Sequence, residues 1–374
     1  MQKIGILGGG QLGRMLLQAA ANYVVETFIL ENDENCPSAH LCTHFVKGNI
    51  QNYDDVYNFG KGLDAITIEI EAVNIDALEA LEKEGVKVYP HTSALRTIKN
   101  KITQKEFYAK NNIPSPKYVI TQNLAELRQH ADFLPAVHKI GEGGYDGKGV
   151  QVIHTTADMD KGFDAPSVLE KEVLIAKEIA ISVAVADNGE IVIYPPAEMV
   201  ADPVLNLLSY QISPARLQKE TLWKAEAIAR RVATEFKSPG LFAVEMFLDT
   251  NNDVWVNETA PRVHNSGHHT IEGNYSSQFD MIWRILLQYP LGNTDPIMPS
   301  SIVNLLGEPG YTGIAKYEGL HEVLRMPNVF VHLYGKEVTK PGRKMGHVTI
   351  LGNDVAELTF RANKVKNTLK VIAE

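Results

Sequence analysis

Short apolar runs alternate with amphipathic segments over the first quarter of the chain. The apolar runs are typical of buried strands and lie at 3–7, 27–30, 65–70 and 86–89. Segments with helical periodicity lie between them, at 14–21 and 75–84. Because two parallel strands need a crossover connection, usually a helix, this alternation predicts a parallel sheet in an α/β domain.

The rest of the chain has a more mixed pattern. Amphipathic helices are expected at 93–111, 222–236 and 279–288, and a strand hairpin at 136–140 and 150–154. Pro114 and Pro116 end the first of these helices. The stretch 291–296 is typical of a linker, and short strands and turns follow it. A chain of 374 residues organised in this way is expected to hold two or three domains.

Two carboxylates face each other in a second predicted hairpin. Asn251 and Asn252 supply the turn between two apolar strands. A register centred there places Glu245 opposite Glu258, and it also places Phe247 opposite Val256. Because like charges directly opposite each other repel, a cation between the glutamates would explain the pair. Carboxylate oxygens suit Mg²⁺ that also holds a substrate phosphate, and a solvated hairpin face is the alternative.

Glycines at the start of the chain fit a dinucleotide-binding turn. Gly8, Gly10 and Gly13 follow a strand and open a helix, and Glu31 ends the next strand, where a ribose-binding acid is expected. The same turn can bind another phosphate group or simply let helix and strand pack closely. NAD is therefore one of several interpretations.

A second glycine-rich loop, at 141–149, lies between two strands. No Ser or Thr follows Lys148, so the loop is not a Walker A motif. Backbone N–H groups of such a loop can cover phosphates, and Lys139 and Lys148 add positive charge. A flexible hairpin tip is the alternative.

Histidines gather shortly after the second carboxylate of the pair. His264, His268 and His269 could suggest zinc, but no cysteine accompanies them and the nearby glutamates suit a harder metal. Arg262, His264 and Asn265 could instead hold an anionic intermediate beside a metal–phosphate site. A capped loop is the structural alternative.

Charge and composition exclude several classes of protein. The formal net charge is −9, so a dominant nucleic-acid surface is not expected. No apolar run is long enough for a transmembrane helix, so no membrane partner is expected. Cys36 and Cys42 do not resemble a disulfide framework, which favours a cytoplasmic location.

Four motifs together resemble those of one enzyme family, the N5-carboxyaminoimidazole ribonucleotide synthase family of ATP-grasp ligases. They lie at 11–15, 143–149, 257–273 and 341–347, and the likeness covers nearly the whole chain. The resemblance implies an ATP-grasp fold that combines α/β and α+β regions. The implied domains are a Rossmann-like N-terminal domain at 1–94, a grasp domain with a small lid at 95–292, and a mixed C-terminal domain at 293–374.

The resemblance also implies a reaction of purine biosynthesis. ATP would phosphorylate bicarbonate to carboxyphosphate, and the amine of 5-aminoimidazole ribonucleotide would capture the carboxyl group. The products would be N5-carboxyaminoimidazole ribonucleotide, ADP and phosphate. ATP as co-substrate and Mg²⁺ are implied, with Mn²⁺ as an alternative ion, and a homodimer is expected because dimers are usual in the family.

Site residues follow from the same resemblance, position by position. ATP contacts are implied at Lys101, Lys139, Gly144, Tyr145, Asp146, Gly147, Lys148, Gly149, Val150, Glu170, Lys171, Glu172, Val173, Glu178, Asn257 and Glu258. Glu245 and Glu258 match metal ligands, in agreement with the hairpin argument. Catalytic roles are implied for Lys148, Arg262, His264 and Asn265, and ribonucleotide contacts for Tyr145, Asp146, Lys336 and Arg343. The last two would hold the 5′-phosphate.

The sequence departs from the family pattern at Asn100, at Gly141 and Glu142, and at Ala201, all on the nucleotide side. A formate-activating purine ligase of the same fold is the nearest alternative, and the segment 261–268 favours the bicarbonate enzyme. An NAD-dependent oxidoreductase or a nucleotide sensor without turnover is a more distant alternative. The first leaves the carboxylate pair unexplained, and the intact pair argues against the second.

Overall fold

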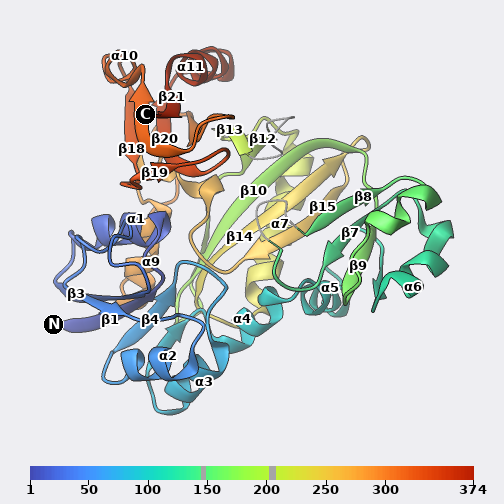
Figure 1. Cartoon of the computed structure of the whole chain (residues 1–374), viewed down its shortest axis with the longest axis horizontal. Helices are drawn as coiled ribbons and strands as arrows, with labels where there is room; N and C mark the ends of the chain where they lie inside the picture. Colours follow the sequence, from blue (N-terminus) through green and yellow to red (C-terminus); the bar gives the residue numbers. More distant parts are fainter. Residues whose placement is uncertain (145–148, 202–207) are drawn as a thin grey trace.

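The computed structural model describes residues 1–144, 149–201 and 208–374. Tyr145, Asp146, Gly147 and Lys148, to which the sequence analysis gave nucleotide, substrate and catalytic roles, lie outside the described residues. Figure 1 shows the N-terminal domain in blue beside a long central sheet, with the C-terminal elements in red above the N-terminal domain.

The N-terminal domain is built on a parallel sheet of five strands, as the sequence pattern predicts. In spatial order the strands are β3 (His44–Lys47), β2 (Val25–Glu31), β1 (Gln2–Leu7), β4 (Ala65–Ile68) and β5 (Lys87–Tyr89). Three helices, α1 (Gln11–Ala20), α2 (Tyr53–Gly60) and α3 (Ile75–Lys83), connect them. The sequence analysis missed β3 and α2, because β3 is largely exposed and therefore lacks an apolar run.

The helix expected at 93–111 is in fact two helices, so that prediction was wrong. α4 (Thr92–Lys99) and α5 (Lys101–Lys110) meet at Asn100. The Asn100 side chain accepts hydrogen bonds from the N–H groups of Ile102 and Thr103, so it caps the second helix. The break places Lys101 at the start of α5, where its side chain can turn towards the central sheet.

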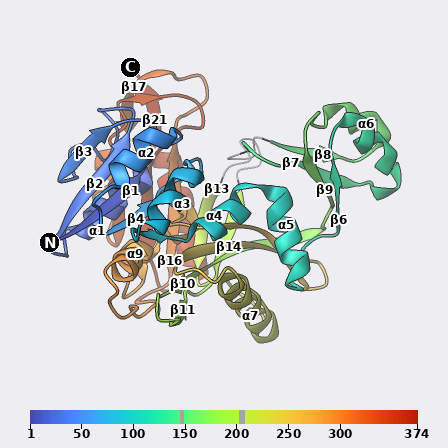
Figure 2. The same cartoon turned by 90° about the horizontal axis from the view of Figure 1, so that it is seen from below.

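A small antiparallel sheet forms the lid, which Figure 2 shows set apart from the rest of the molecule. Its order is β6 (Tyr118–Thr121), β9 (Ser167–Lys171), β7 (Ala136–Ile140) and β8 (Val150–Ile153). The predicted hairpin of β7 and β8 is confirmed, with Ala136 opposite Ile153. Three short helices cover the sheet: α6 (Leu124–Leu127), η1 (Arg128–Phe133) and η2 (Thr156–Lys161).

The central sheet continues from the grasp region into the C-terminal region. Its strands are β15 (Val254–Ala260), β14 (Gly240–Asp249), β10 (Ile175–Val185), β12 (Ala197–Ala201), β13 (Leu208–Ser213), β16 (Ser300–Leu306), β20 (Lys344–Leu351) and β18 (Val329–Leu333), with β11 (Ile191–Ile193) beside β10. On one face α7 (Lys219–Glu235) packs against β10 and β14 around a continuous apolar core. The remaining face is the one that carries the carboxylate pair.

The remaining helices and strands follow β15 in the chain. They are η3 (Asn265–Gly267), α8 (Thr270–Gly273), α9 (Gln278–Leu286), β17 (Gly313–Glu318), α10 (Leu320–Val323), β19 (Val338–Thr339), α11 (Val355–Thr368) and β21 (Lys370–Ala373). α9 ties the regions together, because Trp283 is buried against α1 and donates from Nε1 to Leu16 O at 2.7 Å. No helix within the described ranges is both long and apolar enough to cross a membrane.

Candidate active site

Two cavities of about 400 Å³ each meet on the open face of the central sheet. The lid cavity lies between the lid and the β14–β15 hairpin. The inner cavity is lined by the N-terminal domain, by the segment after β15 and by C-terminal residues. Lys101, Gly144 and Glu258 line both cavities, so the two spaces are continuous at these residues.

The carboxylate pair lies where the sequence predicts it. Glu245 on β14 is opposite Glu258 on β15. The companion prediction was wrong: Phe247 faces Trp255 rather than Val256, because the register shifts by one residue between Glu245 and Met246. The bulge restores the expected pairing at the glutamates.

The same bulge turns two consecutive residues of β15 towards the lid cavity. Successive residues of a regular strand point to opposite faces, but Asn257 and Glu258 both line this cavity. Asn257 Oδ1 accepts a hydrogen bond from Lys139 Nζ at 2.7 Å, and Glu258 Oε2 accepts one from Lys101 Nζ at 2.5 Å. The bulge therefore brings two lysines from separate elements against one strand end.

The environments of the paired glutamates differ. Burial, together with the charge of Glu258, raises the pKa of Glu245, whereas the nearby ammonium of Lys101 lowers the pKa of Glu258. Hard carboxylate oxygens in this arrangement fit Mg²⁺. Within the described ranges no group of three or more His, Cys, Asp or Glu side chains is arranged to hold a metal. A bound Mg²⁺ would therefore take its other ligands from phosphate oxygens and water.

A buried charged cluster lies under the lid cavity. Glu170 on β9 accepts from Lys139 at 3.1 Å and forms an ion pair with Lys105 at 3.3 Å. Burial lowers the pKa of Lys105 to about 8. Sequence reasoning missed Lys105, although its position one turn after Lys101 on α5 could have indicated the same face.

The segment expected to read adenine forms the wall of the lid cavity. Glu170, Lys171, Glu172 and Val173 all line it, as does Val150 across the sheet. The Lys171 ammonium donates to the carbonyls of Phe133 and Leu134 in the lid. Glu178 shares a face of β10 with the carboxylate pair, since it lies opposite Phe247, and burial raises its pKa.

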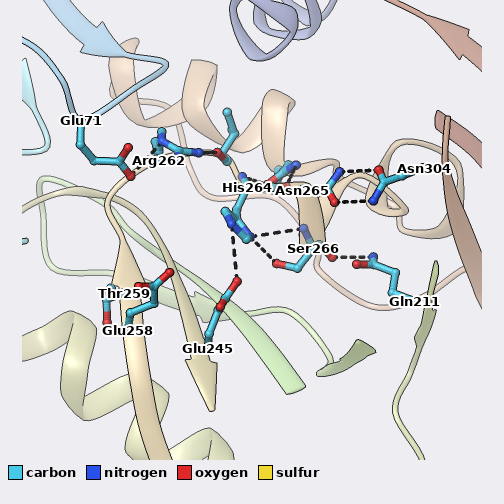
Figure 3. Close-up of polar contacts among 12 residues, drawn as sticks. Glu71, Gln211, Glu245, Glu258, Thr259, Arg262, His264, Asn265, Ser266 and Asn304 are labelled. Carbon is cyan, nitrogen blue, oxygen red and sulfur yellow. Dashed lines mark hydrogen bonds and ion pairs between the residues drawn. The ribbon is translucent and has the colours of Figure 1, made fainter. Parts of the chain in front are cut away.

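Arg262, His264 and Asn265, the predicted catalytic group, come together on the wall of the inner cavity (Figure 3). Arg262 Nε forms an ion pair with Glu71 of the N-terminal domain at 3.0 Å. His264 Nδ1 accepts from the N–H of Ser266, so the neutral ring carries its proton on Nε2, 3.5 Å from Glu245.

The Asn265 side chain is held by hydrogen bonds to a residue of the C-terminal region. Its side-chain amide donates to Asn304 Oδ1 at 3.0 Å and accepts from Asn304 Nδ2 at 2.9 Å, a reciprocal pair that Figure 3 displays. Sequence reasoning missed Asn304, which lies on β16. The other two histidines of the cluster, His268 and His269, are buried, and burial lowers the pKa of each. Their environment is that of neutral rings in a hydrogen-bonded core.

The predicted phosphate-binding cations lie in one loop between β18 and β20. Lys336 Nζ donates to the carbonyl of Lys344, and Arg343 Nη1 donates to the carbonyl of Val338. Lys344, which the sequence analysis did not select, lines the inner cavity together with Tyr334. Of Lys336, Arg343 and Lys344, only Lys344, the first residue of β20, is among the residues that line this cavity.

Two carboxylates of the chain itself accept hydrogen bonds from the N–H groups of the N-terminal glycine turn. Glu31 Oε2 accepts from the N–H of Gly9 at 3.0 Å, and Glu69 accepts from the N–H groups of Gly10 and Gly13. The expected ribose-binding acid is therefore bonded to the turn, and Glu69 lies where a phosphate would bind.

Comparisons with known proteins agree with this architecture. Residues 1–99 match the ribonucleotide synthetase preATP-grasp domain, 106–279 the ATP-grasp domain and 300–361 the phosphoribosylaminoimidazole carboxylase C-terminal domain. The fold and the site thus define an ATP-grasp ligase. The N5-carboxyaminoimidazole ribonucleotide synthase of Mycobacterium tuberculosis is 34% identical over 96% of the chain and 86% of its own length. The chain belongs to the N5-carboxyaminoimidazole ribonucleotide synthase family.

Solved structures extend the likeness to the whole chain. The N5-carboxyaminoimidazole ribonucleotide synthetase of Thermotoga maritima is 36% identical, with a TM-score of 0.93 and full coverage of both chains. The Aspergillus clavatus enzyme in complex with ADP and 5-aminoimidazole ribonucleotide is 32% identical, with a TM-score of 0.89 and 98% coverage of both chains. The chloroplastic phosphoribosylaminoimidazole carboxylase of Vigna aconitifolia is 33% identical over 95% of this chain, which spans only 65% of that longer protein.

Proposed function

We propose that the chain carboxylates 5-aminoimidazole ribonucleotide with bicarbonate at the expense of ATP, in purine biosynthesis. The products are N5-carboxyaminoimidazole ribonucleotide, ADP and phosphate. One observation carries the proposal most directly: Lys101 and Glu258 line both cavities. A nucleotide in the lid cavity would therefore present its terminal phosphate at the entrance to the inner cavity. The family and the substrates named in the relatives' structures support this assignment.

The lid cavity is the proposed ATP site. Lys101 and Lys139 supply positive charge for the phosphates, and the segment from Glu170 to Val173 lies along the wall that would face the base. Glu178 is proposed to bind a ribose hydroxyl, and Gly144, Gly149 and Val150 to lie along the nucleotide. Mg²⁺ held by Glu245 and Glu258 would neutralise phosphate charge and align the terminal phosphate.

In the proposed chemistry, a bicarbonate oxygen attacks the γ-phosphorus of ATP, the bond to the β-phosphate oxygen breaks, and ADP leaves. The resulting carboxyphosphate releases CO₂ and phosphate inside the closed site. The amine of the ribonucleotide then bonds to the CO₂ carbon and loses a proton. Arg262 supplies a guanidinium and Asn265 an amide for the anionic intermediate, and the His264 ring lies beside Glu245.

The inner cavity is the proposed ribonucleotide site. Lys344 lines it, and Lys336 and Arg343 lie in the loop that precedes Lys344, so this loop is the proposed 5′-phosphate site. We also propose a cytoplasmic homodimer. Cys36 and Cys42 are both free thiols, which supports a reducing compartment.

ADP release, followed with a coupled enzyme assay, tests this function. Turnover should require the ribonucleotide, bicarbonate and Mg²⁺ together, and it should fall in bicarbonate-depleted buffer. Formate in place of bicarbonate is the matched control. Equal turnover with formate would favour the formate-activating alternative, and ADP release independent of the ribonucleotide would contradict the proposed acceptor.

A further inference from the structure

The glycine turn at the start of the chain leaves space for one particular side chain, that of Glu69. A Cβ on Gly8 would lie 2.5 Å from Glu69 Cγ, and one on Gly10 would lie 2.4 Å from Glu69 Oε1. A Cβ on Gly13 would lie 3.0 Å from Glu69 Oε2 and 2.9 Å from the Gly8 carbonyl oxygen. All three glycines of the dinucleotide-like motif therefore make room for an internal carboxylate.

Glu69 also supplies the hydrogen bonds that a bound phosphate would supply. Its Oε1 accepts from the Gly10 N–H at 2.6 Å, and its Oε2 accepts from the Gly13 N–H. The first N–H groups of a helix have no partner within the helix, and no side chain at Gly10 caps α1. Glu69 thus caps α1 from a distant part of the chain and places a negative charge at the positive end of its dipole.

The residues that follow Glu69 connect this cap to the active site. The Glu69 N–H donates to Leu7 O at 3.0 Å, which extends the pairing of β1 and β4 by one residue. Two residues further on, Glu71 forms the ion pair with Arg262 at 3.0 Å (Figure 3). Glu69, Glu71 and Arg262 all line the inner cavity. The Arg262 guanidinium, which also donates to the Val263 carbonyl at 3.0 Å, is therefore held on its Nε side by a short segment that is itself fixed at Glu69.

We propose that Glu69 is a positioning residue for Arg262. It occupies the anion-binding turn permanently, which excludes a dinucleotide phosphate, and it fixes the 69–71 segment so that Glu71 orients the guanidinium over the inner cavity. The catalytic part of this proposal rests on the proposed function, in which the Arg262 guanidinium binds the anionic intermediate. The structural part, the occupation of the turn, does not depend on it.

Glu69→Gln is the sharpest variant, and Glu31→Gln is its matched control. Glutamine keeps the shape of Glu69, but its NH₂ group must face one of the two glycine N–H donors and leave that donor unpaired. Glu31 accepts from Gly9 of the same turn and belongs to β2, outside the 69–71 segment. Both variants disturb the turn, and only the first disturbs the connection to Arg262.

The first measurement is nuclear magnetic resonance of the Gly10 and Gly13 amides in labelled protein. In Glu69→Gln we expect faster hydrogen exchange and upfield amide proton shifts at these glycines, whereas Glu31→Gln should affect the amides of Gly9 and Asn32 and leave those of Gly10 and Gly13 unchanged. Titration with NADH and with inorganic phosphate should produce no shift at these glycines in the unmodified chain. Unchanged glycine amides in Glu69→Gln, or binding of NADH in the unmodified chain, would overturn the occupation of the turn.

The second measurement is steady-state kinetics. Glu69→Gln should lower kcat about 10-fold, the loss of roughly one good polar interaction with the anionic intermediate, with the KM for ATP unchanged. In an Arg262→Lys background the same substitution should produce no further change, because its effect passes through Arg262. The positioning role would be overturned if the effects of Glu69→Gln and Arg262→Lys multiplied in the double variant. It would also be overturned if Glu31→Gln lost as much activity as Glu69→Gln. An unmodified chain without ribonucleotide-dependent turnover would overturn the proposed function, and the amide measurement would still decide the Glu69 contacts.

Discussion

Glu245 and Glu258 lie directly opposite each other on β14 and β15. Nearer the turn, the pairing of the two strands is shifted by one residue relative to this pair. The bulge that restores the pairing also directs Asn257 into the lid cavity. Only Glu258 of the two carboxylates is bonded to Lys101. The two glutamates are therefore equivalent in their proposed role as metal ligands, and they differ in what they contribute to the fold.

Glutamine substitution should separate these two contributions. Glu258→Gln and Glu245→Gln should each lower kcat about 10²- to 10³-fold, because each removes one charged ligand from Mg²⁺. Without nucleotide, Glu258→Gln should lower the melting temperature, since Lys101 loses its ion-pair partner, while Glu245→Gln should leave it unchanged or raise it. Calorimetry and ADP release provide the measurements. Activity that survives either change with the same Mg²⁺ dependence would argue against the metal site.

The lid should lose stability in mild acid because of His138. This side chain is fully buried in β7, and burial lowers its pKa to about 4. Its Nδ1 accepts from the Phe163 N–H, and Nε2 bonds to Thr121 Oγ1. The unfolded-state pKa is about 6.5, so the stability is fully present above that value and is lost as the pH falls towards 4.

Hydrogen exchange in the lid strands between pH 7.5 and 5 measures this effect, after correction for intrinsic exchange rates. The lid should open more readily at pH 5, and His138→Gln should flatten the dependence because glutamine does not titrate. His40, an exposed histidine of the N-terminal domain, offers a matched control, since His40→Gln should retain the dependence. An unchanged profile in His138→Gln would assign the acid sensitivity to other groups.

The amide pair of Asn265 and Asn304 should matter for turnover. Asn304→Asp keeps an acceptor for the Asn265 NH₂ group and removes the donor to Asn265 Oδ1. The loss of one such bond should lower kcat about 5- to 10-fold, with the KM for ATP unchanged. A normal kcat in Asn304→Asp would mean that Asn265 needs no support from β16.

The loop between β18 and β20 offers a direct comparison of neighbouring cations. Lys344 lines the inner cavity, so Lys344→Ala should raise the KM for the ribonucleotide about 10- to 100-fold, equivalent to about 1.4–3 kcal/mol of lost binding. The sequence analysis assigned the 5′-phosphate to Lys336 and Arg343, and Arg343→Ala is the comparison variant. Since Arg343 donates to the Val338 carbonyl, we expect the smaller effect there. If either change weakens ATP and spares the ribonucleotide, the two cavities have been assigned the wrong way round.

Some features of this molecule could be predicted from local sequence patterns, and others could not. The parallel N-terminal sheet could be predicted because buried strands and crossover helices leave periodic patterns. The predicted Glu245–Glu258 pairing is correct, but the register next to the turn is one residue off, and only the bulge, which could not be predicted from the sequence, restores the pairing at the glutamates. The break at Asn100 was hidden by continuous amphipathic character, although asparagine is a strong helix N-cap.

Contacts between segments far apart in the sequence leave no local pattern from which they could be predicted. Asn304 and Asn265 are 39 residues apart, and Glu69 and Gly10 are 59 residues apart, so only the fold brings each pair together. The glycine motif illustrates the difference. Its spacing indicates an anion-binding turn, but the identity of the anion depends on which side chain the sheet places there.

Transfer of ¹⁸O from labelled bicarbonate is the most direct test of the central claim, that ATP activates bicarbonate for capture by the ribonucleotide. If a bicarbonate oxygen attacks the γ-phosphorus, each phosphate released should carry one oxygen from bicarbonate, detected as an isotope shift by ³¹P nuclear magnetic resonance. The measurement is made with the ribonucleotide present and before bicarbonate exchanges with water. We expect one labelled oxygen per phosphate. Phosphate that carries no label under these conditions would contradict the account, because ATP would then be cleaved without phosphorylating bicarbonate.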